Sequence, residues 1–420
     1  MRAGSAPGGV TPQAGTAGRR RLAVRVTKDA ERQLRGGHPW VFDRSITSVT
    51  DGGVPGDLAV VFDAKRRFLA IGLYDPSSPI RVRVLHQGEP TPIDREWWHA
   101  RLRDALDRRA ELVASADTTG YRWVHGENDA LPGLVVDRYG PTSVVKLYSA
   151  AWFPHLPVVV ESLAELVETE SVVLRLARNV TPPDDGRGDL ADGSALVGSL
   201  PEHPVRFLEH GLAFEADVVR GQKTGFFLDQ RDNRARVGEL ARGRRVLDLF
   251  CCTGGFSVHA AAGGAAEVHS VDISPGAIEA ATRNMDANSG VTAVARCRHE
   301  TLVGDAADQM VALARSGERY GLVVLDPPSL ASRGPQRAAA LGAYRRLGEL
   351  ATDLVEPGGT LVAASCSSRI GADEHAETIA EAVAQRGRTL TGITRTGHAV
   401  DHPVGFAEGA YLKAVIATVP

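Results

Sequence analysis

The stretch Arg245 to Ser274, RVLDLFCCTGGFSVHAAAGGAAEVHSVDIS, decides the fold of this chain. It opens with a short apolar run typical of a buried parallel strand, and Gly254 and Gly255 then precede the Ala-rich start of a helix. A second short strand over 267–271 ends on Asp272. Glycines at a strand-to-helix turn let backbone N–H groups approach a ligand, and an acid after the second strand is placed for the hydroxyls of a ribose. The stretch therefore predicts a site for a nucleoside-containing cofactor.

The form of the turn indicates which nucleoside is bound. A nicotinamide or flavin site usually has the pattern G-x-G-x-x-G, whereas this turn reads C-C-T-G-G-F. The string D-x-F-x-x-T-G-G-F, with its acid in the first strand, resembles the first motif of S-adenosylmethionine-dependent methyltransferases. A generic nucleotide-binding fold is the alternative from this motif alone. The resemblance implies S-adenosylmethionine as the cofactor, held by Gln230, Arg231, Asp248, Phe250, Cys252, Gly254, Gly255, Phe256, Asp272, Asp305, Asp326 and Pro327.

The remainder of the C-terminal half alternates strands with helices. This alternation predicts a doubly wound, Rossmann-like α/β sheet, whose ligands lie outside the carboxyl ends of its strands. Asp305 falls where such folds present an acid near the adenine amine, and a plain helix cap is the alternative.

The string K-T-G-F-F-L-D-Q-R over residues 223–231 precedes the first strand of this sheet. Gly225 permits a tight turn and the two Phe offer an aromatic wall, while Gln230 and Arg231 are expected to cap the cofactor pocket. A helix start with both Phe side chains in the core is the alternative. The string closely resembles ribosomal RNA methyltransferases that carry a PUA-type domain.

A second motif, Asp326-Pro327-Pro328, follows the buried strand expected over 321–325. Two prolines fix the backbone and remove two N–H donors, which leaves a carbonyl and a carboxylate facing the pocket. A planar nitrogen base could be held there through its amino and ring-nitrogen edge. The family resemblance implies that Asp326 is catalytic and that Pro328 contacts the substrate base. A simple strand-ending turn is the alternative.

A cysteine, Cys366, closes a later apolar run between Ser365 and Ser367. A lone buried cysteine is usually an inert small hydrophobe, but at the carboxyl end of a strand it would face the same pocket. The string S-C-S resembles the nucleophile of PUA-containing ribosomal RNA 5-methylcytosine methyltransferases. The resemblance implies that the Cys366 thiolate adds to carbon 6 of a cytosine and thereby activates carbon 5.

The resemblance extends from about residue 24 to the C-terminus, where D-H-P-V and E-G-A-Y-L-K occupy 401–404 and 408–413. Two positions depart from the family pattern. Cys252 stands where the family commonly has Tyr, and Ser329-Leu330 replace an aromatic residue after Asp-Pro-Pro. The first departure could alter cofactor packing, and the second could alter the base pocket.

The N-terminal region consists of short strands separated by Gly and Pro turns, which predicts a small β-barrel. Its opening, K-x-x-E-R-x-x-x-x-G-H-P-W-V-F, resembles the PUA-type RNA-binding domain. The resemblance implies that Lys28, Arg32, Arg35 and His38 face RNA phosphates, and a solvated basic surface is the alternative. Trp40 is expected in the core of the barrel.

Changes in composition along the chain predict four regions. Residues 1–21 are built from small and polar residues and are expected to form a disordered tail. The PUA-like domain is expected over 22–95, an α/β linker domain with one helix over about 95–112 is expected within 96–204, and the methyltransferase domain is expected over 205–420.

Composition also limits the function classes. No apolar run reaches the ~18 residues that a membrane helix needs, and the N-terminus lacks the apolar segment of a secretory signal. Four cysteines without C-x-x-C spacing argue against a disulfide framework or a metal site, which fits a reducing cytoplasm. Residues 1–95 carry 15 Lys and Arg against nine Asp and Glu, although the whole chain has a net charge of −3. A basic N-terminal module on an acidic body is typical of contact with phosphate.

The sequence therefore predicts a cytoplasmic enzyme that makes 5-methylcytosine in large-subunit (23S) ribosomal RNA. Its expected partner is ribosomal RNA, with no membrane and no metal, and a homodimer is left open. One alternative is methylation of another base, at a guanine nitrogen or at uracil carbon 5. The other is a non-catalytic RNA-binding protein that retains the fold.

Overall fold

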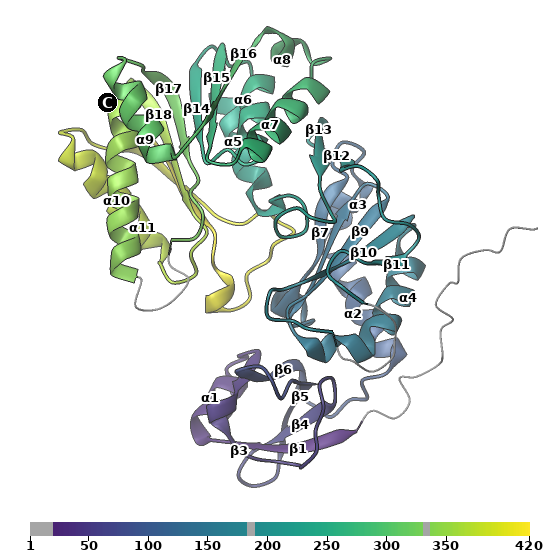
Figure 1. Ribbon diagram of the computed structural model, residues 1–420. Coiled ribbons are helices and arrows are strands. Elements are labelled where there is room, and N and C mark those ends of the chain that lie inside the picture. The colour runs from purple at the N-terminus through teal and green to yellow at the C-terminus, as the bar shows by residue number, and fades with distance from the viewer. Residues whose placement is uncertain (1–19, 183–189, 331–336) are drawn as a thin grey trace, which may run out of the picture.

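The computed structural model describes residues 20–182, 190–330 and 337–420, which form three domains in chain order (Figure 1). The first 19 residues of the expected tail lie outside the described residues. Arg20 accepts a hydrogen bond from Leu58 N at 3.1 Å, and the first strand begins at Arg21. The expected boundary at residue 21 is therefore slightly too late.

The N-terminal domain is a six-stranded mixed sheet with one helix. Its first strand alternates exposed and buried residues, which places Leu22 and Val24 in the core. The strands expected here are present, whereas the helix α1 and the short strand β3 were not predicted. In sheet order the strands are β2 (Trp40–Phe42), β6 (Ile80–Gln87), β5 (Phe68–Tyr74), β4 (Leu58–Phe62), β1 (Arg21–Val26) and β3 (Ile46–Val49), with α1 (Lys28–Arg35) and the 3-10 turn η1 (Asp43–Ser45).

The middle domain is a five-stranded sheet covered by helices. The single helix predicted here is broken, because Arg109 turns into the protein to pair with Asp129. The strands, in sheet order, are β11 (Ala195–Val197), β10 (Ser171–Leu176), β9 (Thr142–Leu147), β8 (Leu134–Tyr139) and β7 (Gly120–His125). The helices are α2 (Arg95–Asp107), α3 (Ala110–Ala114) and α4 (Leu156–Leu166), with the 3-10 turns η2 (Gly126–Asp129) and η3 (Ala150–His155).

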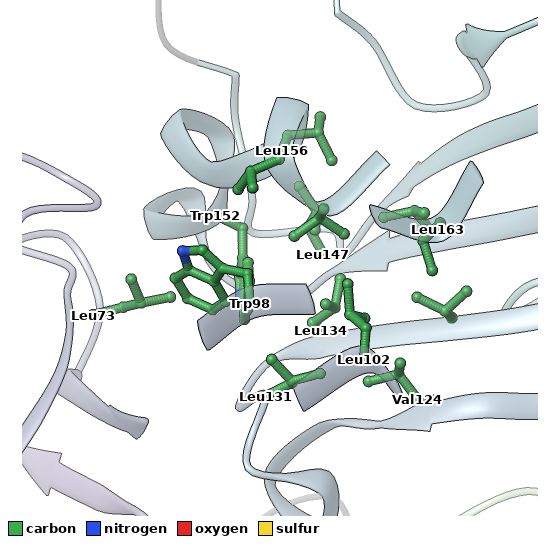
Figure 2. Close-up of a cluster of buried hydrophobic side chains, with 14 of the residues drawn as sticks. Leu73, Trp98, Leu102, Val124, Leu131, Leu134, Leu147, Trp152, Leu156 and Leu163 are labelled. Carbon is green, nitrogen blue, oxygen red and sulfur yellow. The ribbon is translucent and has the colours of Figure 1, made fainter. Parts of the chain in front are cut away.

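One apolar core joins the first two domains. Trp98 and Trp152 are fully buried in the middle domain, and Leu73 reaches them from β5 of the N-terminal domain (Figure 2). Because burial of such side chains contributes about 1.5–3 kcal/mol each, this contact stabilises the pair of domains as one body.

The C-terminal domain is a seven-stranded sheet preceded by a hairpin. The sheet order is β16 (Arg298–Val303), β15 (Glu267–Asp272), β14 (Arg245–Leu249), β17 (Tyr320–Leu325), β18 (Val355–Ser365), β20 (Lys413–Val419) and β19 (Thr391–Thr396), and the hairpin is β12 (Val205–Glu209) with β13 (Leu212–Ala216). The helices are α5 (Arg231–Leu240), α6 (Gly255–Ala262), α7 (Pro275–Ala287), α8 (Thr292–Arg296), α9 (Ala306–Arg315), α10 (Arg337–Leu354) and α11 (Ala372–Gln385), with the 3-10 turns η4 (Leu228–Gln230) and η6 (Ala407–Gly409).

The order of these strands confirms the doubly wound, Rossmann-like sheet. Strands β16, β15, β14, β17 and β18 are parallel, and β20 enters antiparallel beside β18. The strand order reverses at β14, so the topological switch point lies between β14 and β17. The carboxyl ends of β14, β15, β17 and β18 therefore share one edge, where ligands of such sheets bind.

Trp40 is not a barrel-core residue, contrary to the sequence prediction. It is only partly buried, and its indole Nε1 donates to Glu127 of the middle domain at 2.8 Å. Its ring also meets Phe406 of the C-terminal domain edge-to-face, with ring centroids 5.2 Å apart. Trp40 therefore joins three domains, because an indole needs a hydrogen-bond partner that the apolar barrel core does not offer.

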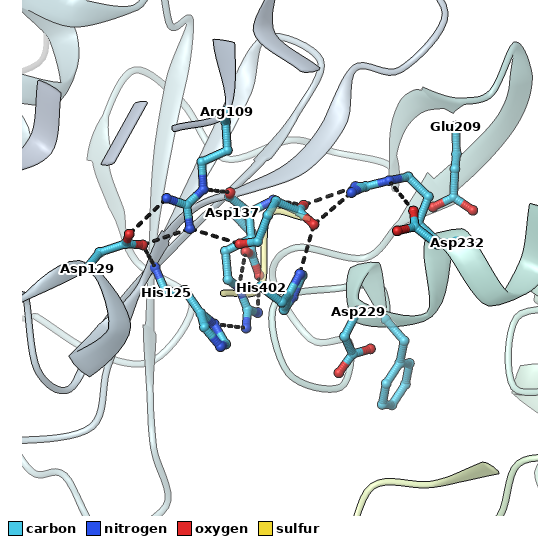
Figure 3. A network of polar contacts seen from close by, with 12 residues as sticks. Arg109, His125, Asp129, Asp137, Glu209, Asp229, Asp232 and His402 are labelled. Carbon is cyan, nitrogen blue, oxygen red and sulfur yellow. Dashed lines mark hydrogen bonds and ion pairs between the residues drawn. The ribbon is translucent and has the colours of Figure 1, made fainter. Parts of the chain in front are cut away.

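A second interface, here called the junction network, joins the middle and C-terminal domains through buried charges (Figure 3). Asp401 accepts two hydrogen bonds from the Arg231 guanidinium, at 2.7 and 3.0 Å, and one from the backbone N of Arg122 at 2.8 Å. The network consists of Arg109, Arg122, Asp129, Asp137, Arg231, Asp401 and His402, all of them buried.

Candidate functional site

The turn after β14 has the backbone that the glycine motif predicts. Gly254 has φ +75°, and a Cβ there would lie 2.8 Å from the Cβ of Ala281. Phe250 and Cys252 also have positive φ, 63° and 50°, which is uncommon for residues with side chains. Such backbone strain concentrates at ligand sites. Helix α6 then begins at Gly255 with no side chain capping its N–H groups, so these groups face the strand-end edge.

Asp272 ends β15 beside this turn. One carboxylate oxygen accepts from Cys252 N and the other from Ser274 N, both at 2.9 Å. The side chain is partly exposed, so its remaining lone pairs are open to a ligand. The predicted position of Asp272 next to the glycine turn is thus realised.

Asp248 lies inside the sheet below the turn. It is fully buried and accepts from Ser257 Oγ at 2.6 Å, while its other oxygen, Oδ1, has no hydrogen-bond partner among the described residues. Burial raises the pKa of Asp248 to about 7. A glycine turn, uncapped N–H groups, an open acid for ribose hydroxyls and an orphaned carboxylate oxygen together fit a nucleoside cofactor such as S-adenosylmethionine.

Other predicted cofactor residues have different surroundings. Gln230 is buried, and its side-chain amide lies close enough to Asp326 to lower the pKa of that carboxyl. Phe256 is buried in the core of the domain. Arg231, which the sequence placed at the pocket, is instead consumed by its ion pair with Asp401. The guanidinium therefore belongs to the junction network, and a role of Arg231 at the cofactor stays a prediction.

Asp305 is exposed and caps helix α9. Its carboxylate accepts from Ala307 N at 2.9 Å and from Asp308 N at 3.2 Å. This geometry supports the cap, which was the alternative interpretation of Asp305.

Asp326 extends from the end of β17, next to the turn after β14. Burial raises the pKa of Asp326 to about 7, and the nearby Asp229 carboxylate acts in the same direction. At neutral pH a large share of the Asp326 side chains is therefore protonated and can donate a hydrogen bond. Pro327 is buried beneath it, and Pro328 is exposed at the rim.

Cys366 follows the end of β18, the strand next to β17. It is partly exposed, and burial together with the Asp326 carboxylate raises the pKa of its thiol to about 11. The flanking Ser365 donates to Tyr344 Oη at 2.9 Å and accepts from Ser367 N at 3.3 Å, which folds the backbone around the cysteine. Two neighbouring strands thus present an acid and a thiol to one edge.

Sequence reasoning did not assign a charged group on the other side of this edge. Lys223 Nζ lies 3.0 Å from an Asp229 oxygen and 4.2 Å from the centre of the Phe227 ring. Tyr411 Oη donates to the same Asp229 oxygen at 2.8 Å. These residues lie in the strings K-T-G-F-F-L-D-Q-R and E-G-A-Y-L-K, so the family resemblance of those strings was the sequence signal that could have identified them.

The predicted phosphate-facing residues lie in the N-terminal domain. Lys28, Arg32 and Arg35 are exposed on α1, where Arg32 pairs with Asp29 and Arg35 with Glu31. His38 is partly buried, 3.8 Å from a carboxylate oxygen of Glu408 in the C-terminal domain. The structure does not gather these residues with the strand-end groups.

One group of possible metal ligands lies at the opposite end of the sheet. Ligand atoms of Glu267, His269 and Glu300 are within 4.8 Å of one another. Arg245 donates to Glu267 at 2.7 Å and Arg298 pairs with Glu300, so these acids already have cation partners.

In the described part of the chain, no helix is long and apolar enough to cross a membrane.

Comparisons with known proteins identify the family of this chain. Residues 187–414 match the model of an S-adenosylmethionine-dependent methyltransferase, and residues 24–87 match a PUA-like domain. The chain is 50% identical over 399 residues to a ribosomal RNA large subunit methyltransferase of Deinococcus radiodurans, which covers 94% of this chain and 97% of that protein. It is 34% identical over 397 residues to ribosomal RNA large subunit methyltransferase I of Tolumonas auensis, covering 94% and 98%.

Solved structures share the fold over nearly the whole chain. A candidate SAM-dependent methyltransferase from Streptococcus mutans superposes with a TM-score of 0.78 at 20% identity, covering 94% of this chain and 99% of that one. A candidate methyltransferase crystallised with S-adenosylhomocysteine gives a TM-score of 0.79 at 20% identity, covering 95% and 99%. The chain therefore belongs to the PUA-containing family of S-adenosylmethionine-dependent methyltransferases that includes the ribosomal RNA large subunit methyltransferases.

Proposed function

We propose that this methyltransferase modifies carbon 5 of a cytosine in large-subunit ribosomal RNA through a covalent adduct of Cys366. The observation that carries the proposal is the pair formed by Asp326 and Cys366. They follow neighbouring parallel strands, β17 and β18, beside the glycine turn of the cofactor. A methyl transfer to nitrogen needs no thiol at this position, whereas transfer to carbon 5 of a pyrimidine does.

The chemistry assigns one role to each residue. S-adenosylmethionine supplies an electrophilic methyl group on a sulfonium sulfur. The Cys366 thiol loses its proton and its sulfur bonds to carbon 6 of the base, which makes carbon 5 nucleophilic. Protonated Asp326 hydrogen-bonds to the ring nitrogen and draws electron density from carbon 6. After methylation, the carbon 5 proton passes to solvent and the sulfur leaves carbon 6 as a thiolate, which restores the aromatic ring.

Ribosomal RNA is proposed as the substrate because the two relatives named above carry that substrate in their names. The PUA-like domain and the basic N-terminal region supply surface for RNA phosphates. A cytoplasmic site of action follows from this substrate, and we leave open whether the enzyme dimerises.

Methylation of large-subunit ribosomal RNA with isotope-labelled S-adenosylmethionine tests the proposal. Mass spectrometry of the digested nucleosides is expected to find the label in 5-methylcytidine. Cys366→Ala is expected to abolish the product, while Cys297→Ala, which removes a partly exposed thiol elsewhere, leaves it unchanged. Label in a methylguanosine or in 5-methyluridine would replace the proposal with the corresponding alternative, and no transfer with intact RNA binding would indicate a non-catalytic protein.

A further inference from the structure

Lys413 is a buried cation that the chemistry above does not use. It opens β20 and pairs with Ser365 in the antiparallel ladder, which sets it beside the residue before Cys366. The side chain is almost completely buried. Its ammonium donates to the backbone carbonyls of Ser367 and Ile370, the latter at 2.8 Å. Lys413 thus holds the chain segment that begins with the thiol.

Burial of the Lys413 ammonium costs free energy that its two hydrogen-bonded carbonyls do not offset. Within the described residues its hydrogen bonds go to carbonyls, and no carboxylate lies within 4.0 Å of it. Burial accordingly lowers the pKa of Lys413 to about 8, while Cys366 acts in the opposite direction. Buried charges are normally paired, so the missing anion calls for an explanation.

The charged groups around the Cys366 thiol indicate that the missing anion is the Cys366 thiolate itself. Asp326 and Asp229 disfavour a Cys366 thiolate, and Lys223 favours it from the segment before α5. Tyr344 places a hydroxyl near Cys366 from α10. Burial lowers the pKa values of His375 and His398, and the Lys413 charge acts in the same direction. Because Lys223 already pairs with the Asp229 carboxylate at 3.0 Å, a second cation near Cys366 favours the thiolate.

We infer that Lys413 is a positioning residue for Cys366, whose ammonium anchors the thiol-bearing segment and supplies the positive charge that the thiolate needs. The inference rests on the proposed function. When the thiolate forms, the thiol proton passes to solvent, and the negative sulfur favours the protonated form of Lys413. The residue acts through Cys366 and makes no contact with the base in this scheme.

The rate at which iodoacetamide alkylates Cys366, followed from pH 6.5 to pH 8 by peptide mass spectrometry, tests the inference without RNA. Lys413→Gln keeps N–H donors for the two carbonyls but removes the charge. We expect its profile to move to higher pH by about one unit, so alkylation at pH 7.5 slows about tenfold. Lys413→Arg keeps the charge and is expected to stay within about threefold of the unmodified protein. A Gln variant with an unchanged profile would overturn the inference.

Two controls isolate the charge effect. Cys297, another partly exposed thiol whose pKa burial raises to about 11, is expected to alkylate at the same rate in every variant. Lys65→Gln removes a charge from an exposed surface site and is expected to leave the Cys366 profile unchanged. If Lys413→Gln does not fold, Lys413→Arg decides the matter, because a shift of one pH unit with the charge retained would also overturn the inference.

The assay also separates this inference from the proposed function. Thiol reactivity is measured on the protein alone, so a different methylated base would leave a shifted profile intact. Conversely, confirmed 5-methylcytidine with an unshifted profile in Lys413→Gln would overturn the role of Lys413 only.

Discussion

The junction network and the strand-end edge both bury acids, but they treat them in opposite ways. Burial disfavours the Asp401 carboxylate, yet His402 and Arg231 hold the pKa of Asp401 well below its ordinary value. At the strand ends, burial raises the pKa values of Asp248 and Asp326 to about 7. Each acid of the first region has a cation partner, whereas Asp248 and Asp326 in the second region have no ion-pair partner among the described residues.

The difference separates structure from chemistry. A paired buried acid is already satisfied and can do little beyond holding two domains together. An acid without a cation retains a proton near neutral pH and keeps hydrogen-bonding capacity for a ligand. On this criterion we propose the strand-end edge as the reacting centre. Arg231 pairs with Asp401 in the junction network, whereas its neighbour Gln230 lies near Asp326.

The largest expected effect comes from breaking the junction network. Asp401→Asn leaves Arg231 buried without its anion and is expected to lower the free energy of unfolding by about 3–5 kcal/mol. Urea unfolding at pH 7 measures the loss. Asp373→Asn makes the same change in an exposed pair with Arg395 and is expected to cost about 1 kcal/mol or less. Equal losses in the two variants would remove the structural role of the network.

A smaller effect is expected at the cofactor. Asp272→Ala removes the open acid beside the glycine turn, and each lost charge-assisted hydrogen bond costs about 1.5–3 kcal/mol. The Kd for S-adenosylmethionine, measured by calorimetry, is therefore expected to rise about ten- to hundredfold or more. Asp305→Ala, which removes a helix cap, is expected to leave that Kd nearly unchanged. The reverse ranking would restore Asp305 to the cofactor site.

The pH dependence of stability distinguishes the two regions further. The folded-state pKa of Asp248 is about 7 against an ordinary 3.8, so the folded chain binds a proton that the unfolded chain has released. Its contribution to stability is therefore present below about pH 4 and is lost as pH rises to about 7. Asp248→Asn cannot ionise and is expected to flatten this fall by up to about 1.4 kcal/mol per pH unit. Urea midpoints between pH 4 and 7 measure it, and identical slopes would contradict the raised pKa.

The smallest effect is expected from the N-terminal tail. Removal of residues 1–19 is expected to leave Tm and cofactor affinity unchanged, because their composition offers little to bury. Differential scanning calorimetry measures Tm. A fall of several degrees would show that the tail packs on the domains.

Sequence predicted those features that depend on local pattern and strand order. Asp272, Asp326 and Cys366 reach one edge because each lies at the carboxyl end of a parallel strand of the same sheet. Arg231 could not be placed, because its partner Asp401 is 170 residues away in the chain.

The local sequence pattern likewise could not predict which side chains make contacts over long distances in the chain. Trp40 is held by Glu127, 87 residues away. Lys413 is level with Ser365 only because β20 pairs with β18 in one particular register. Long-range partners and register, rather than element type, set the limits of the sequence prediction.

We propose that the strand-end edge is a reacting centre with Cys366 as its nucleophile. RNA carrying 5-fluorocytosine at the target tests it most directly, because fluorine cannot leave as the carbon 5 proton does. In the presence of S-adenosylmethionine, we expect a covalent protein–RNA complex whose cross-linked peptide contains Cys366, and Cys366→Ala should give no complex while still binding the cofactor. A complex formed through Cys252, or full methylation by Cys366→Ala, would contradict the account.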